Sequence, residues 1–130
     1  ERGELPEGEL MDNYVTFVAS IFRSVRFGAS SAHGKANMLR FNYFCEAGAI
    51  IRDETTGRYK VEFDKMQSAM TSLSELILTL QGNGDYDGVK KLMADKGSIG
   101  DLLQADLDRL AEAGIPIDVV FEQGKSVLGL

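Results

Sequence analysis

Apolar residues recur at intervals of three and four near the start of the chain. The apolar positions of this stretch are Met11, Tyr14, Val15, Val18, Ile21, Phe22 and Val25. Polar residues such as Asn13, Thr16 and Ser20 fall on the opposite side of the same predicted helix. This spacing is typical of an amphipathic helix, and Gly28 is expected to end it.

The next segment, from about Ala32 to Gly48, is apolar on nearly all sides. The hydroxyl of Ser30 or Ser31 can cap its amino end. A helix that is apolar all round is usually buried. This helix is therefore predicted to lie at the centre of the fold.

The period of the pattern changes at "RYKVEF", where apolar and charged residues alternate. Tyr59, Val61 and Phe63 fall on one side, which predicts a strand. The preceding "DETTG" is typical of a turn, and Ile50 and Ile51 can supply the partner strand of a small hairpin.

A third helix is predicted after the hairpin. Asp64 and Gln67 resemble a capping box at its start. Its apolar stripe consists of Met66, Met70, Leu73, Ile77 and Leu80. The sequence "QGNGD" is expected to break this helix.

Two shorter helices complete the prediction. Asp85 can cap one that closes at Gly97, and the other runs from about Ile99 to Ala113, before Gly114. The last apolar stretch, "IPIDVVFEQG", is expected to be extended. No linker divides the chain, so residues 1–130 are predicted to form a single, mainly α domain of about five helices with one small β-hairpin.

Composition narrows the classes of protein that this chain can represent. With 130 residues, 44% of them hydrophobic, it can bury a core of ordinary size. A net charge of −6 argues against a nucleic-acid partner. No apolar run approaches the roughly 18 residues of a membrane span. One cysteine and no signal peptide at the amino end favour the cytoplasm, and the absence of an initiator Met is compatible with a piece of a longer protein.

The charge is distributed unevenly along the chain. Between Asn13 and Cys45 there is no Asp or Glu. The cations of this span are Arg23, Arg26, Lys35 and Arg40. A surface of one sign can attract and hold an anion, and Arg26 and Lys35 are candidates for such an anion patch. The alternative is that two packed helices simply carry their charges at their edges.

Polar residues share one face of the predicted central helix. His33, Asn37 and Arg40 are separated by four and three residues, so their side chains project from the same side. This face either lines a cleft and meets a substrate or reaches solvent with satisfied polar groups. The pattern alone leaves both interpretations open.

Metal binding and a catalytic dyad within this chain are not expected. If His33 and Cys45 lie on one helix, they are separated by a rise of roughly 18 Å and by roughly 120°. The chain has no other histidine or cysteine to complete a zinc site. Cys45 is therefore predicted to pack as a small apolar residue. "NGDYDG" is similar to a calcium loop, but Ala94 occupies the position of the required Glu.

The block "SVRFGASSAHGKANMLRFNYFCEAGAI" resembles the carboxy-terminal part of the dipeptidyl peptidase III family of zinc metallopeptidases. The similarity is greatest to the branch that is fused to a Nudix domain in plants and is often labelled a Zn-dependent hydrolase in bacteria. It continues through "LSELILTLQGNGDYDGVKKLM" and "GIPIDVVFEQG" and covers most of the chain. Its most specific part is "AHGKANM".

The resemblance implies a parent enzyme with a mostly helical, zinc-bearing lobe and a wide substrate cleft. The family's zinc ligands come from an H-E-x-x-G-H helix and a Glu on a second helix, both upstream of the segment that this chain resembles. The chain would then supply core packing and part of the cleft wall, without zinc, cofactor or catalytic residue of its own. The isolated chain is expected to be inactive.

The partners that the resemblance implies are the remainder of the parent chain and, through it, a peptide substrate. Self-association through an apolar patch left exposed by the missing lobe is also expected. A different class of function stays open as an alternative, namely a self-standing helical protein-interaction domain without catalysis.

One position departs from the family's pattern. Typical members have Ala-His followed by an Arg four residues after that His. His33 matches the His, whereas Asn37 occupies the position of the Arg. Arg40, one turn further along the same face, can partly compensate. A hydrolase of other specificity and a degenerate peptidase are therefore both compatible with the sequence.

Overall fold

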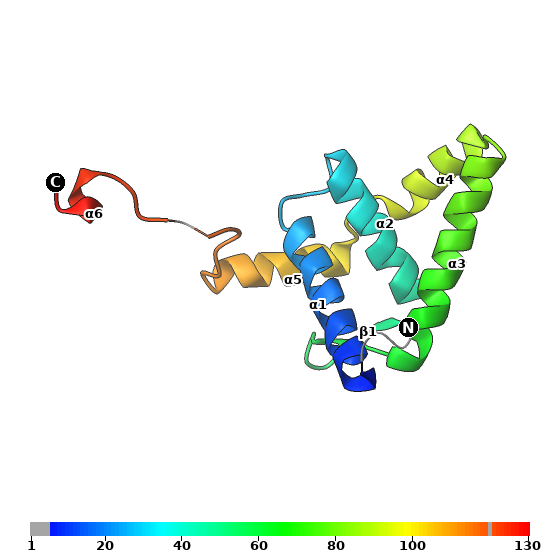
Figure 1. The fold of residues 1–130 in the computed structure, drawn as a ribbon, viewed down its shortest axis with the longest axis horizontal. Helices are drawn as coiled ribbons and strands as arrows, with labels where there is room; N and C mark the ends of the chain where they lie inside the picture. Colours follow the sequence, from blue (N-terminus) through cyan, green and yellow to red (C-terminus); the bar gives the residue numbers. More distant parts are fainter. Residues whose placement is uncertain (1–5, 120) are drawn as a thin grey trace.

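The protein is described by a computed structural model that covers residues 6–119 and 121–130. Within these residues the chain forms six helices and one two-stranded antiparallel sheet (Figure 1). The elements in chain order are α1 (Glu7–Val25), α2 (Ala32–Glu46), β1 (Ile50–Arg52), β2 (Tyr59–Val61), α3 (Phe63–Gly82), α4 (Tyr86–Lys96), α5 (Asp101–Glu112) and α6 (Lys125–Leu128). The predicted mainly α domain with one small hairpin is thus confirmed.

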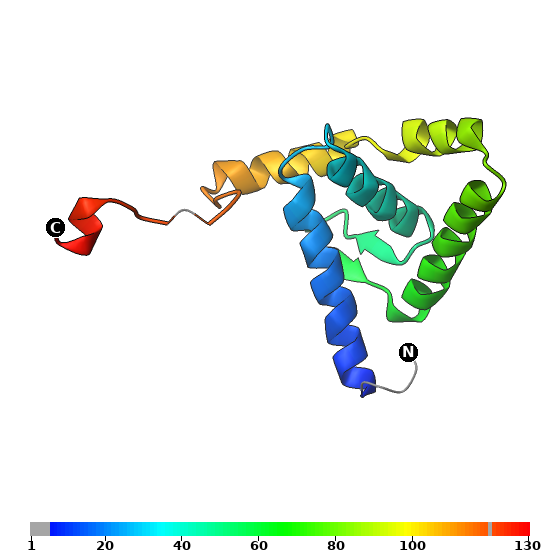
Figure 2. The same ribbon diagram turned by 45° about the horizontal axis from the view of Figure 1, so that its top comes forward.

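Helix α2 lies at the centre, as its all-round apolar sequence predicts. It contacts α1, α3, α4 and β1, and Figure 2 shows it enclosed by the other elements. Met38, Leu39, Phe41 and Phe44 are buried on it. Edge-to-face contacts join Phe44 to Phe17 of α1, with ring centroids 6.2 Å apart.

The predicted apolar stripe of α1 is only partly covered. Tyr14, Val18 and Ile21 are buried, whereas Met11 and Val15 are exposed. The exposed positions belong to the same helical face, so part of this stripe is left uncovered by the residues that the structure describes. In the described residues, no helix is long and apolar enough to cross a membrane.

Local capping signals predicted two helix starts correctly. The Ser31 Oγ accepts a hydrogen bond of 3.0 Å from the Gly34 N–H at the start of α2. A carboxylate oxygen of Asp85 accepts one of 2.8 Å from the Gly88 N–H at the start of α4. These bonds satisfy backbone donors that the first helical turn leaves unpaired.

The predicted start of the third helix was wrong. Helix α3 has Glu62 as its N-cap and no side-chain capping bond, so the proposed box of Asp64 and Gln67 does not mark its start. The reason is that β2 runs almost directly into α3, which leaves Asp64 inside the first turn. Its charge there still favours the helix amino end. Helix α5 runs from Asp101 to Glu112, which agrees with the predicted helix from about Ile99 to Ala113 within the usual uncertainty of a helix boundary.

The loop before α2 packs tightly onto the first turn of that helix. Gly34 is buried there, and a Cβ at this position would collide with the carbonyl oxygen of Gly28. Gly28 itself has a φ of 88°, in the left-handed region that glycine adopts readily. Both glycines are thus needed for the connection between α1 and α2.

The hairpin lies between α1 and α3 (Figure 2). Its register places Ile50 opposite Val61 and Arg52 opposite Tyr59. The turn is held by Asp53, whose Oδ1 accepts hydrogen bonds from the N–H and the hydroxyl of Thr56, at 2.7 and 2.9 Å. These bonds also lower the pKa of the Asp53 carboxyl.

Beyond α5 the chain leaves the helical body, and we call residues 115–119 and 121–130 the C-terminal arm (Figures 1 and 2). Its apolar side chains are exposed, namely those of Ile115, Ile117, Val119, Phe121, Val127, Leu128 and Leu130. The start of the arm is attached to the end of α1. Arg26 donates hydrogen bonds to the carbonyl oxygens of Ile115 and Pro116, and Arg23 pairs with Asp118 at 2.7 Å.

Candidate functional site

The face of α2 that carries His33, Asn37 and Arg40 begins in the first turn of the helix. His33 and Arg40 are exposed, and Asn37 is half-buried. The Asn37 Nδ2 donates a hydrogen bond of 2.6 Å to the Ser24 Oγ of α1. The Arg40 Nη1 donates one of 3.2 Å to the Asn37 Oδ1. We call His33, Asn37 and Arg40 the His33 face.

These contacts connect the polar residues in series. Ser24 fixes Asn37, and Asn37 accepts from one guanidinium nitrogen of Arg40. Because a guanidinium has five N–H donors, most of the donors of Arg40 are left to face outward. In the described part of the chain, the His33 ring makes no hydrogen bond or ion pair. The face can therefore offer an imidazole and a positioned guanidinium to an anionic group.

The two residues of the predicted anion patch lie in different places. The guanidinium of Arg26 is directed at the carbonyl oxygens of Ile115 and Pro116. Lys35 is exposed on α2 and lies about 160° around the helix from His33. No hydrogen bond or ion pair among the described residues joins Arg26 or Lys35 to the His33 face. Their role in anion binding stays a prediction.

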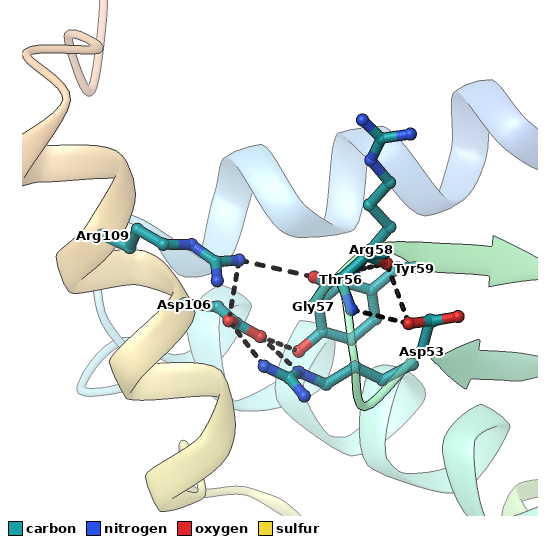
Figure 3. A network of polar contacts seen from close by, with 8 residues as sticks. Asp53, Thr56, Gly57, Arg58, Tyr59, Asp106 and Arg109 are labelled. Carbon is teal, nitrogen blue, oxygen red and sulfur yellow. Dashed lines mark hydrogen bonds and ion pairs between the residues drawn. The ribbon is translucent and has the colours of Figure 1, made fainter.

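A second polar group, which the sequence analysis missed, lies between the hairpin and α5 (Figure 3). Its centre is Asp106, which is only 6% exposed. The Asp106 carboxylate accepts from Arg52 Nε at 2.7 Å and Nη2 at 3.0 Å, and from the Tyr59 hydroxyl at 2.8 Å. Arg109 Nη2 lies 3.0 Å from its Oδ1. We call Arg52, Tyr59, Asp106 and Arg109 the Asp106 cluster.

The hairpin register and the helix period bring these residues together. Arg52 and Tyr59 are directly opposite each other and therefore project from the same face of the sheet. Asp106 lies on the apolar side of α5, between the buried Leu103 and Leu107. A carboxylate within an apolar stripe is a signal for a buried ion pair, because buried charges are almost always paired.

The turn of the hairpin is shaped to the cluster. Gly57 has a φ of 66°, and its carbonyl oxygen lies 3.5 Å from Arg109 Nη2. A Cβ on Gly57 would lie 2.8 Å from both terminal nitrogens of Arg109 and 3.2 Å from Arg52 Nη2. The positive φ thus favours glycine at this position, and a Cβ would in addition push the two guanidinium groups aside.

The electrostatics of the cluster argue against proton transfer. Hydrogen bonds from Arg52 lower the pKa of Asp106 to about 2. Burial, together with the hydrogen bond to Asp106, raises the pKa of the Tyr59 phenol above its usual range. Asp106 is then ionised and Tyr59 protonated at neutral pH, so neither group is poised for acid–base chemistry. The cluster instead attaches the hairpin to α5.

A groove of about 690 Å³ lies beside the hairpin, between α1, β2 and α5. We call it the hairpin groove. Its apolar walls consist of Val15, Val18, Ala19, Phe22, Val61, Phe63 and Leu110. Its polar boundary consists of Gly57, Arg58, Tyr59, Lys60, Asp106 and Arg109. The groove thus combines an apolar wall with a basic rim.

A zinc ion such as the one implied for the parent needs three or four closely placed ligands. Among the described residues, no three His, Cys, Asp or Glu side chains gather closely enough to hold a metal ion. Burial, and next the neighbouring Glu46, raise the pKa of the Cys45 thiol to about 11. Cys45 is therefore a thiol that packs against the core, in line with its prediction as a small apolar residue.

Comparisons with known proteins relate the chain to a longer protein. No protein-family model matches it. A curated plant relative, named Nudix hydrolase 3 of Arabidopsis thaliana, is 38% identical over 118 residues, which are 91% of this chain and 15% of that protein. Its name describes a different activity from the names of the similar solved structures.

Two solved structures of dipeptidyl peptidase III superpose on the chain. The protein from Caldithrix abyssi gives a TM-score of 0.76 at 39% identity, over 82% of this chain and 20% of that one. The protein from Corallococcus sp. strain EGB gives 0.75 at 38% identity, over 82% and 19%. The chain is therefore related in sequence and fold to one part of dipeptidyl peptidase III chains, and it spans a fifth or less of these relatives.

Proposed function

We propose that the chain is the carboxy-terminal part of the catalytic lobe of a zinc-dependent peptidase or hydrolase of the dipeptidyl peptidase III type. In this role it supplies core packing and part of the wall of the substrate cleft. The similarity to two dipeptidyl peptidase III structures supports the type of parent. The observation that carries the assignment of the wall is the fixed Ser24–Asn37–Arg40 series with its outward-facing guanidinium.

Each residue of the His33 face has a separate task in this proposal. Arg40 pairs with a carboxylate of the peptide substrate. Asn37 is a positioning residue, because it holds Arg40 through its Oδ1 and is itself held by Ser24. His33 offers a hydrogen bond from an exposed imidazole. An Arg–carboxylate pair in a partly desolvated cleft contributes about 1.5–3 kcal/mol.

The zinc ion and its ligands belong, in this proposal, to the remainder of the parent chain. The isolated chain is then expected to bind no zinc tightly and to cleave no dipeptidyl substrate, because one His and one Cys leave too few ligands. Elemental analysis after dialysis against a chelator tests this expectation. Cys45 is free, which fits a reducing compartment such as the cytoplasm.

The test of the cleft wall is Arg40→Ala in the intact parent enzyme. We expect kcat/KM for a peptide substrate to fall about tenfold or more, with the melting temperature nearly unchanged. Lys91→Ala is a matched control, since Lys91 is an exposed cation on α4. A lower melting temperature together with unchanged kinetics would show that Arg40 only ties α2 to its surroundings.

The exposed apolar side chains of the arm favour a second candidate, the self-standing protein-interaction domain. The coding sequence upstream of Glu1 distinguishes the two. An H-E-x-x-G-H motif there supports the peptidase lobe, whereas a start codon directly before Glu1 supports the interaction domain.

A further inference from the structure

The antiparallel pairing of the hairpin determines which main-chain groups of β2 point away from β1. At one end of the pair, the Asp53 N–H donates to the Arg58 carbonyl oxygen at 2.8 Å. At the other end, the Glu62 N–H donates to the Ala49 carbonyl oxygen at 2.9 Å. In an antiparallel pair, residues that exchange hydrogen bonds alternate with residues that do not. These two bonds therefore fix the bonded positions along both strands.

The edge of β2 that faces away from β1 is open. By the alternation, Lys60 is bonded to β1, whereas Tyr59 and Val61 direct their main-chain N–H and C=O groups away from it. No hydrogen bond among the described residues engages these outward groups. An unpaired edge of this kind is a template for an added strand, and native proteins usually keep such edges covered.

The hairpin groove lies on the open side of β2. Residues of α1, β2 and α5 line it, whereas none of the residues of β1 does. Its α1 wall includes Val15, which is 48% exposed although it belongs to the apolar stripe of that helix. The wall continues with Val18, Ala19 and Phe22. The open strand edge and an uncovered apolar wall thus adjoin each other.

Two guanidinium groups at the rim of the groove have donors to offer. Arg58 is exposed, its side chain makes no hydrogen bond or ion pair among the described residues, and Figure 3 shows it directed away from the Asp106 cluster. Arg109 binds Asp106 through Nη2 at 3.0 Å, and 58% of its side chain stays exposed. Lys60 differs from both, because its Nζ already pairs with Glu62 at 2.6 Å. The two arginines can therefore receive a carboxylate from an occupant of the groove.

These features describe an extended polypeptide as the occupant. In a strand, side chains at alternate positions project to one face, so every second residue can cover the apolar wall. An Asp or Glu beside them meets the two arginines. A lipid would cover the wall and pair with the arginines, but it would leave the main-chain groups of Tyr59 and Val61 without partners. The open edge thus favours a peptide strand over a lipid.

A longer parent can supply this strand from its own chain. The 130 residues span 20% and 19% of the two dipeptidyl peptidase III chains, so most of each of these relatives lies outside the part that matches. A segment of the same molecule is held near the groove at a high effective concentration, which favours it over a separate protein of equal intrinsic affinity. The parent chain is therefore the favoured source of the strand.

We propose that the hairpin groove holds a strand from the remainder of the parent chain, which lies outside residues 1–130 and pairs with the open edge of β2. Apolar side chains of this strand cover Val15 and its neighbours on α1, and an acidic residue pairs with Arg58 and Arg109. The hairpin is then part of a sheet of at least three strands, which anchors the helical unit to the rest of the parent. This inference rests on the proposed function, under which the 130 residues belong to a longer parent.

Amide hydrogen exchange in the intact parent, measured without substrate and resolved to single residues, tests the strand pairing. The Lys60 N–H is the internal reference, because it is bonded to β1. We expect the protection factors of Tyr59 and Val61 to lie within about tenfold of that of Lys60, since all three N–H groups would be paired. A lower protection factor at either residue would overturn the proposal.

The Val15→Asp variant of the parent tests whether the groove holds this strand. A carboxylate on the apolar wall should displace the strand, so the protection factors of Tyr59 and Val61 should fall at least about tenfold while that of Lys60 is unchanged. Leu78→Asp is the matched control, because Leu78 is apolar and 66% exposed on α3 but does not line the groove. Unchanged protection in Val15→Asp, or equal effects of the two substitutions, would count against the groove as the seat of the strand and overturn the proposal.

The exchange measurement is independent of the test of the cleft wall. Arg40 lies on α2 and does not line the groove. Arg40→Ala is therefore expected to leave the protection factors of Tyr59 and Val61 unchanged, whatever its effect on kcat/KM. Unprotected N–H groups together with a lower kcat/KM in Arg40→Ala refute the added strand alone, and the reverse result refutes the cleft wall alone.

Photocrosslinking in the intact parent identifies the source of the strand. A benzophenone amino acid replaces Val15, and mass spectrometry maps the products after illumination and digestion. We expect a link within one molecule to a segment outside residues 1–130 in which apolar residues alternate with Asp or Glu. A link between two copies, to a lipid or to a different protein would overturn the proposal, as would the absence of the expected link.

Discussion

The Asp106 cluster and the His33 face are both polar groups on helices, but their hydrogen-bonding capacity is used differently. Asp106 is 6% exposed, and its carboxylate is shared by two arginines and a tyrosine of the same fold. Arg40 is exposed, and only one of its guanidinium nitrogens donates a hydrogen bond to Asn37 among the described residues. Buried and saturated groups stabilise a fold, whereas exposed and positioned donors can bind a ligand.

The largest effect that separates the two regions is expected from Asp106→Ala. This substitution leaves the guanidinium of Arg52 partly buried and without its carboxylate, so the free energy of unfolding should fall by about 3–5 kcal/mol. Urea denaturation measures this change in the free energy of unfolding. Asp108→Ala is the control, because Asp108 is exposed on the same helix and should change stability by less than about 0.5 kcal/mol. Equal losses of stability in Asp106→Ala and Asp108→Ala would show that the burial of Asp106 adds nothing to its contribution.

Acid should weaken the Asp106 cluster. The pKa of Asp106 is lowered in the fold to about 2 from its ordinary 3.8. The stabilisation is therefore complete above the ordinary pKa and is lost as the pH falls through the folded value. Urea midpoints of Asp106→Asn should depend less on pH in this window than those of the wild type. If the urea midpoints of Asp106→Asn and of the wild type change with pH in parallel, the pH dependence does not come from Asp106.

A smaller loss is expected from Gly57→Ala. The substitution forces an alanine to a φ of 66° and places its Cβ 2.8 Å from the Arg109 guanidinium nitrogens. We expect a cost of about 1–3 kcal/mol in the free energy of unfolding. Gly82→Ala is the matched control, since a Cβ there meets nothing within 4 Å in a helix and should be neutral or stabilising.

The smallest effect on stability is expected from Arg40→Ala in the isolated chain. Because Arg40 is exposed and its one bond to Asn37 is long, the free energy of unfolding should change by less than about 0.5 kcal/mol. Thermal denaturation of the wild-type chain and of Arg40→Ala, run in parallel, measures this change in stability. A loss comparable to that of Asp106→Ala would remove the distinction between the two regions.

The features predicted correctly from the sequence are those encoded by neighbouring residues. The caps by Ser31 and Asp85, the central position of α2 and the hairpin follow from local spacing. The Asp106 cluster was missed because it joins residues 54 positions apart. The period of α5 can reveal that Asp106 is buried, but it does not identify Arg52 and Tyr59 as its partners.

For the His33 face, the sequence predicted which residues share a side of the helix, but not the tertiary contacts of the neighbouring cations. Helical offsets placed His33, Asn37 and Arg40 on one side of α2, and the bond from Arg40 to Asn37 agrees with that. The sequence also suggested that Arg26 and Lys35 gather in a patch, but pairing of Arg26 with carbonyl oxygens of the arm depends on tertiary structure. The substrate role of the His33 face stays a prediction.

The fit of Gly34 against the Gly28 carbonyl has a consequence for evolution. In "AHGKAN" the glycine is fixed by packing, so every homologue with this connection should retain it, whatever reaction the homologue performs. Its neighbours His33 and Lys35 are exposed and are free to drift unless selection for binding preserves them. If the His33 face binds a ligand, substitutions among homologues are expected to be rarer at His33 than at Lys35.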